Sequence, residues 1–139
     1  MASRLYVGYA VPDMDLRGVH VLVVEDTDDT RNLLRVVLEY WGALVTTAAS
    51  ATEAKSLLQD IRPHVIVTDI AMPDDGVALV REVMHQAAAL RIHVPVIALS
   101  AHRDRAAELR RAGFVEFIAK PFDPTELCRA VHRHLRPAA

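Results

Sequence analysis

The sequence contains a single cysteine, Cys128, among its 139 residues, so no disulfide can form within the chain. No apolar stretch reaches the length that a membrane span requires. The apolar residues 5–11 follow only one arginine and end at Pro12, so we interpret them as part of an extension and not as a signal peptide. Together these absences predict a cytoplasmic protein that does not contact a membrane.

Several catalytic and binding motifs are also missing. The chain has neither of the glycine-rich phosphate-binding loops, which disfavours dinucleotide-dependent dehydrogenases and P-loop nucleotide hydrolases. Ser100 does not lie in a G-x-S-x-G motif, which disfavours a serine hydrolase. The seven histidines lack zinc-site spacing, and we interpret them as surface residues. The formal net charge of −2 gives no reason to expect direct binding to nucleic acid.

What the chain does contain is a series of short apolar runs, each of which ends in a chemically capable residue. Uninterrupted apolar runs are typical of strands that are buried on both faces of a parallel sheet. Ligand sites in such sheets lie at the carboxyl ends of the strands, so we expect these residues to converge at one edge. The runs are 21–24 before Glu25 and Asp26, 65–68 before Asp69, 96–99 before Ser100, and 117–119 before Lys120.

Helical patterns alternate with these strands. Ala43–Ala48 is predicted as a further strand, and the helices are expected after Thr27, from Ser50, after the loop 72–76, over 103–112, and from Asp123. Five strand–helix units predict an α/β fold in which helices cover both faces of a parallel sheet. The apolar fraction of 52% is sufficient for a core, and the length indicates one domain.

Three carboxylates at neighbouring strand ends, those of Glu25, Asp26 and Asp69, would repel one another without a cation. Oxygen ligands of this kind favour a hard divalent ion, Mg²⁺ or Mn²⁺. The alternative is that each acid caps the helix that follows it. For a single acid, capping is about as frequent as metal binding. Lys120 precedes Pro121, which restricts its backbone and therefore directs its side chain. Ser100 alone is also typical of an ordinary turn.

The ordered strings VLVVED (21–26), DIAMP (69–73), ALSA (98–101) and AKPF (119–122) resemble the receiver domain of two-component response regulators. The similarity covers about residues 18–136. It implies a flavodoxin-like, doubly wound (βα)5 parallel sheet with strand order 2-1-3-4-5. It also implies a receiver domain over residues 18–139, preceded by an N-terminal extension over residues 1–17.

The resemblance implies a role for each matching residue. Asp69 corresponds to the phosphoacceptor, whose carboxylate forms an acyl phosphate. Asp26 is expected to bind Mg²⁺ (or Mn²⁺) directly, Glu25 through water, and Ala71 through its backbone carbonyl.

The remaining implied roles concern the response to phosphorylation. Ser100 and Lys120 are expected to bind phosphoryl oxygens, and Phe117 occupies the position of the switch aromatic. Their movement would alter a face made by the fourth helix, fifth strand and fifth helix.

The expected phosphodonor is a histidine kinase or a histidine phosphotransfer protein, and the output is expected through a downstream protein partner, with a homodimer as a further possibility. The chain is not expected to be an enzyme beyond its own phosphorylation and dephosphorylation. A stand-alone regulator, a phosphorelay intermediate and a receiver from a hybrid kinase all fit. Two alternatives are a pseudo-receiver that acts as an interaction module, and a Mg²⁺-dependent phosphatase, which is disfavoured because Ala71 stands where its second acid would lie.

Two departures from the family pattern are present. Gly76 follows Asp69 by seven residues instead of eight, so the loop before the third helix is one residue short. The interval from Ser100 to Lys120 is also shorter than in many members, which predicts a trimmed fourth helix.

Overall fold

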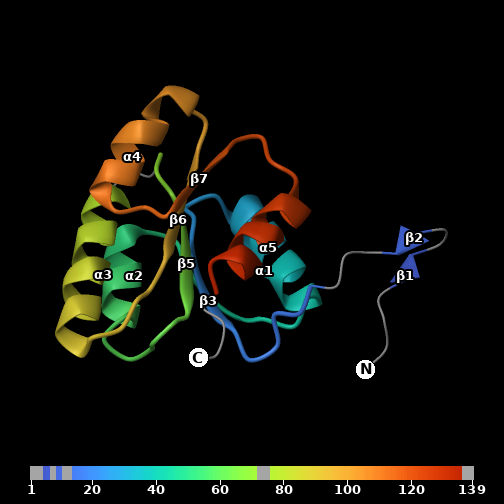
Figure 1. The fold of residues 1–139 in the computed structure, drawn as a ribbon, viewed down its shortest axis with the longest axis horizontal. Helices are drawn as coiled ribbons and strands as arrows, with labels where there is room; N and C mark the ends of the chain where they lie inside the picture. The colour runs from blue at the N-terminus through green and yellow to red at the C-terminus, as the bar shows by residue number, and fades with distance from the viewer. Residues whose placement is uncertain (1–4, 7–8, 11–13, 72–75, 136–139) are drawn as a thin grey trace.

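The computed structural model describes residues 5–6, 9–10, 14–71 and 76–135. Its centre is a five-stranded parallel sheet in the order β4-β3-β5-β6-β7, which confirms the predicted order 2-1-3-4-5 (Figure 1). A separate antiparallel pair lies in the extension and stands apart from this sheet. The strands are β1 (Leu5–Tyr6), β2 (Tyr9–Ala10), β3 (His20–Val24), β4 (Leu44–Ala48), β5 (Val65–Asp69), β6 (Val96–Ser100) and β7 (Glu116–Ala119).

Helices cover both faces of the central sheet (Figure 1), as predicted. One layer consists of α1 (Asp28–Tyr40) and α5 (Pro124–Arg133). The other consists of α2 (Ala51–Leu57), α3 (Gly76–Leu90) and α4 (Ala106–Ala112). Within the described residues, no helix is both long and apolar enough to cross a bilayer.

The uninterrupted apolar runs are explained by this double coverage. Successive side chains of a strand point to opposite faces, so both sets must be apolar when both faces are covered. In β3, Val21 and Val23 pack in the α1/α5 core, whereas Leu22 and Val24 pack against α2 and α3. The same double burial holds β5 and β6 rigidly, and therefore fixes the positions of the residues at their ends.

Local signals start and stop the helices close to the predicted positions. The Ser50 hydroxyl accepts the Glu53 N–H at 3.0 Å, and the Asp123 carboxylate accepts the Thr125 N–H at 2.8 Å. At the other end of α1, Gly42 adopts a φ of +102°, a conformation that favours glycine. The Ser50 and Asp123 caps therefore end the loops that follow β4 and β7.

The structure differs from the predicted helix bounds in two places, and it adds one observation on the predicted extension. The helix expected over 103–112 is divided into a 3₁₀ turn, η1 (Arg103–Arg105), and the seven-residue α4, in agreement with a short fourth helix. Gly76 begins α3 instead of ending a loop, and the shortened segment 72–75 itself lies outside the described residues. Within the predicted extension, Met14 and Leu16 are buried in the α1/α5 core.

Candidate functional site

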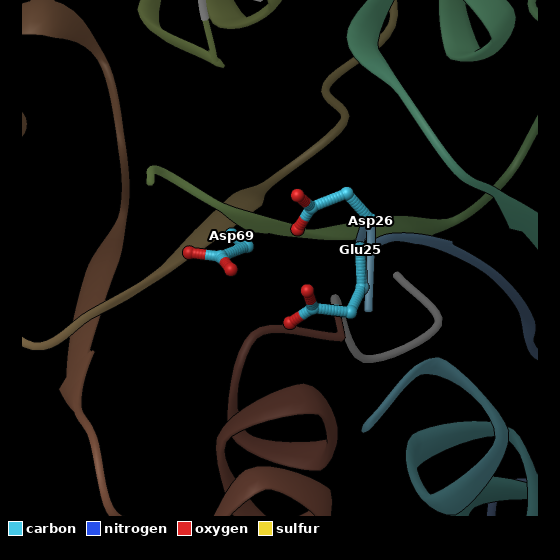
Figure 2. Close-up of side chains that lie close together, drawn as sticks. All are labelled: Glu25, Asp26 and Asp69. Atoms are coloured by element: carbon cyan, nitrogen blue, oxygen red, sulfur yellow. The ribbon is translucent and has the colours of Figure 1, made fainter. Parts of the chain in front are cut away.

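Three carboxylates meet at the carboxyl edge of the sheet (Figure 2). Glu25 and Asp26 directly follow β3, Asp69 ends β5, and these two parallel strands are neighbours. One carboxylate oxygen from each residue lies within 4.8 Å of the others, and in Figure 2 the three groups surround a common space. Glu25 and Asp69 are 1% and 4% exposed, whereas Asp26 is exposed. The predicted convergence of these acids is therefore present.

Lys120 places one cation against the two buried acids. Its Nζ lies 2.8 Å from Asp69 Oδ2 and 3.2 Å from Glu25 Oε1, although the three residues come from three different strand ends. Its backbone N–H donates to the Ser100 carbonyl at 2.9 Å, and its peptide bond to Pro121 is cis. The two ion pairs hold the ammonium group against the buried acids.

The pKa values of Glu25 and Lys120 are both raised by their surroundings in this cluster. Burial raises the pKa of Glu25, and the nearby Asp69 charge adds to the effect, while the Thr27 N–H and Lys120 oppose it. For Lys120, burial acts to lower the pKa, but its hydrogen bonds and ion pairs with Asp69 and Glu25 outweigh burial and raise it. Lys120 is therefore firmly protonated, and the site still has more acid than base.

Ser100 and Ala71 lie beside the acids without joining the ion pairs. The Ser100 side chain is 1% exposed, and its Oγ accepts the His102 N–H at 3.0 Å, as a turn residue does. The Ala71 N–H donates to Asp69 Oδ1 at 3.0 Å. The prediction for Ala71 concerned its carbonyl, so the contact found involves the other polar group of its backbone.

Phe117 is separated from the carboxylates. It is half-buried on β7, pairs in register with Ala98, and packs against the core on the α2/α3/α4 side. It is therefore part of the apolar packing beside β6 and not of the charged cluster.

Arg31 contacts the site but was not predicted from the sequence. Its Nη1 donates to the Glu25 carbonyl at 2.9 Å, and its Nη2 lies 2.5 Å from Asp28 Oδ1. The available signal was its position in the first turn of α1, three residues after Asp28 and five after Asp26. This spacing alone does not distinguish it from an ordinary surface ion pair on a helix.

The donor atoms of this edge suit a hard divalent cation. All three side chains offer carboxylate oxygens, which Mg²⁺ and Mn²⁺ prefer over softer ligands. Two of the acids are buried with only one ammonium group between them. The cluster can therefore hold a metal ion without burying excess positive charge. Asp69 also offers a carboxylate that lies next to a fixed ammonium group.

Comparisons with known proteins agree with this geometry. The family model described as response regulator receiver domain matches residues 21–132. A 14.6 kDa protein of Leptolyngbya boryana, described as uncharacterized, is 44% identical over 123 residues, which cover 86% of this chain and 92% of that protein. The transcriptional regulatory protein FixJ of Rhizobium meliloti is 36% identical over 81% of this chain but only 55% of its own length.

The solved structures give the same result. The chemotaxis protein CheY4 of Vibrio cholerae superposes with a TM-score of 0.76 at 29% identity, over 84% of this chain and 98% of that one. This chain thus spans nearly all of CheY4 but about half of FixJ.

Proposed function

This chain belongs to the response regulator receiver domain family of two-component systems, and on that premise we propose that Asp69 accepts a phosphoryl group from a phosphorylated histidine of a partner protein. The proposal is supported mainly by the groups that surround Asp69. Its buried carboxylate lies 2.8 Å from the Lys120 ammonium and within a group of three acids. Phosphoryl transfer depends mainly on positioning and charge stabilisation, and this arrangement supplies both.

In the proposed step, a carboxylate oxygen of Asp69 attacks the phosphorus atom. The new O–P bond forms as the N–P bond of the phosphohistidine breaks, and the imidazole leaves with the electron pair of that bond. The Lys120 ammonium is placed to balance negative charge on the phosphoryl oxygens. The receiver is the acceptor in this reaction and does not turn over a separate substrate.

Glu25, Asp26, Asp69 and the Ala71 carbonyl would hold Mg²⁺, or Mn²⁺, at this edge. When bound, the ion supplies positive charge that offsets the carboxylates and the incoming phosphoryl group. Glu25 is already engaged by Lys120 and by the Thr27 N–H at 3.1 Å, which supports an indirect role through water. The exposed Asp26 is the acid available for direct contact.

The response to phosphorylation is proposed to start at Ser100 and Lys120. A phosphoryl group on Asp69 offers three strong acceptor oxygens, which these two side chains can bind. Movement of Ser100 away from its turn contact with His102 would free space toward the half-buried Phe117. The face made by α4, β7 and α5 would then differ between the two states, and a downstream protein would recognise that difference.

We further propose that residues 18–139 form the receiver domain, with residues 1–17 as an extension whose Met14 and Leu16 pack into the receiver core. The phosphodonor is a histidine kinase or a histidine phosphotransfer protein. The site of action is the cytoplasm, where such donors present their phosphohistidine.

The test is phosphorylation by acetyl phosphate and Mg²⁺, followed by intact-mass measurement. The wild-type protein should gain one phosphoryl group that is lost at alkaline pH, as expected of an acyl phosphate. Asp69→Asn should gain none, whereas Asp60→Asn, which changes an exposed aspartate outside the cluster, should behave as wild type.

An adduct that persists in Asp69→Asn would contradict the proposed acceptor. A wild-type protein that binds Mg²⁺ but gains no phosphoryl group, either from acetyl phosphate or from a phosphohistidine protein, would instead identify a pseudo-receiver.

A further inference from the structure

The turn between β3 and α1 carries Asp26, the one acid of the cluster whose side chain is exposed. An exposed aspartate on a turn is not held by packing, so its direction depends on the backbone on either side of it. Two peptide units flank its Cα atom. The first contains the Glu25 carbonyl, and the second contains the Thr27 N–H.

Both of these peptide units are tied by side chains. Arg31 Nη1 donates to the Glu25 carbonyl at 2.9 Å, and the Thr27 N–H donates to Glu25 Oε2 at 3.1 Å. Fixing both units fixes the direction of the Asp26 Cα–Cβ bond, since few backbone torsions remain free between them. The turn is therefore held from outside by Arg31 and from inside by the buried Glu25.

The guanidinium group suits this position in a way that an ammonium group does not. Its planar fork donates in two directions, to the Glu25 carbonyl and to Asp28 Oδ1, with 2.5 Å between Nη2 and the aspartate oxygen. Asp28 also neutralises the charge of Arg31, which would otherwise repel a cation at the acidic edge. Arg31 is only 21% exposed, so its side chain is restricted by its surroundings.

We propose that Arg31 is a positioning residue that orients Asp26 for binding a divalent cation. This inference rests on the proposed function, because it concerns the metal expected at that site. Arg31 offers no ligand atom itself and acts only through the backbone of the turn. Residues that orient metal ligands typically contribute about 10- to 100-fold in metal affinity.

The experiment is a titration of the purified 139-residue protein with Mn²⁺, in which free Mn²⁺ is measured by electron paramagnetic resonance. Arg31→Gln and Arg31→Lys should each weaken affinity by about tenfold, because neither keeps the fork. The matched controls are Arg35→Gln and Arg35→Lys. Arg35 lies one turn later on α1 and pairs with Glu39 at 2.8 Å. These controls should stay within about twofold of wild type.

A second measurement separates orientation from general stability. In the metal-free protein, Arg31→Gln should accelerate hydrogen exchange of the Thr27 amide, with unchanged exchange in the strands. Wild-type Mn²⁺ affinity in both Arg31 variants would overturn the proposal, because metal binding would then not depend on Arg31. Wild-type affinity in Arg31→Lys alone would also overturn it, because a positive charge would then be enough without the guanidinium fork. An equal loss in the Arg35 variants would also overturn it. Absence of Mn²⁺ and Mg²⁺ binding by the wild type would overturn the proposed function itself, together with this inference.

Discussion

Two ion-pair clusters lie at opposite ends of the central sheet, and they differ in the balance of their charges. At the carboxyl edge, Glu25 and Asp69 are buried around Lys120, with Asp26 close by. Acids outnumber the base here, and burial and the neighbouring Asp69 charge raise the pKa of Glu25. This cluster has more negative charge than the chain itself neutralises.

At the amino edge the single acid is matched by an arginine. Glu116, the first residue of β7, accepts from Arg133 Nη2 at 2.5 Å and lies 2.7 Å from His134 Nε2. Burial acts to raise the pKa of Glu116, but the hydrogen bonds with these two groups outweigh burial and lower it. The single acid is thus satisfied within the chain.

The difference shows why the carboxyl edge of the sheet is the better candidate for a cation site. A buried excess of acid is stabilised by any added cation, whereas a carboxylate that is already paired has no such need. Both clusters join residues from different elements, so the presence of ion pairs alone does not identify a site. The deciding features are burial and the sign of the remaining charge.

The largest expected effect comes from removing Lys120, the base that pairs with the two buried acids of the carboxyl edge. Lys120→Ala leaves two buried carboxylates without their cation, and should lower the free energy of unfolding by about 2 kcal/mol in metal-free buffer. The measurement is urea unfolding followed by circular dichroism. Arg133→Ala at the amino edge is the comparison. It should lower that free energy by less than about 1 kcal/mol, since Arg133 is 55% exposed. Equal losses would remove the distinction between the two clusters.

Added metal should act at one edge only. Mg²⁺ at ten times its dissociation constant should stabilise the wild type by about 1.4 kcal/mol, because it binds the folded state alone. Asp26→Asn should lose most of this gain, as it removes the exposed carboxylate that is proposed to bind the ion. Glu116→Gln should keep all of it. Thermal unfolding with and without Mg²⁺ measures both, and an undiminished gain in Asp26→Asn would exclude that residue from the site.

The amino edge should show its own dependence on pH. Because the pKa of Glu116 is lowered in the folded state, its contribution is present above the ordinary value of 4.5 and is lost as the pH falls through the folded value. Glu116→Gln should therefore be less stable than wild type near neutral pH, by under about 1 kcal/mol, and equally stable in stronger acid.

Urea unfolding at neutral pH and at steps below 4.5 tests this sign. Glu108→Gln serves as control, because Glu108 also pairs with an arginine but is exposed. That variant should show no measurable change. A wild-type advantage from Glu116 that grows in acid would contradict the assigned direction.

The smallest expected effect tests whether Asp28 shields the carboxyl edge from the charge of Arg31. Asp28→Asn keeps the Arg31 contact with the Glu25 carbonyl but leaves the guanidinium charge unbalanced. Affinity for Mn²⁺ should fall by about twofold and recover in high salt, because Asp28 is largely exposed and its charge is readily screened. A decrease that persists in high salt would point instead to a structural role for Asp28.

Much of the fold was predictable because its signals are local. The apolar runs of β3, β5 and β6, the Ser50 cap and Gly42 each act within a few residues, so their positions follow from the sequence. The start of the seven-residue α4 was less predictable. The residues Arg103–Arg105 form a 3₁₀ turn, but their types are equally compatible with an α-helix. Met14 and Leu16 carry no periodic signal, and their burial depends on α1 and α5.

For the site, the sequence by itself determined which acids and which lysine stand at the strand ends, since a buried strand ends where its apolar run ends. The tertiary structure decided how these groups share their charges. The contact of Arg31 with the Glu25 carbonyl spans six residues and depends on how the turn that carries Asp26 enters α1. The pairing of Lys120 with both Glu25 and Asp69 depends on atoms brought together from three separate strand ends. Spacing along the chain carries no record of such contacts, because they are formed only when the strands align in the sheet.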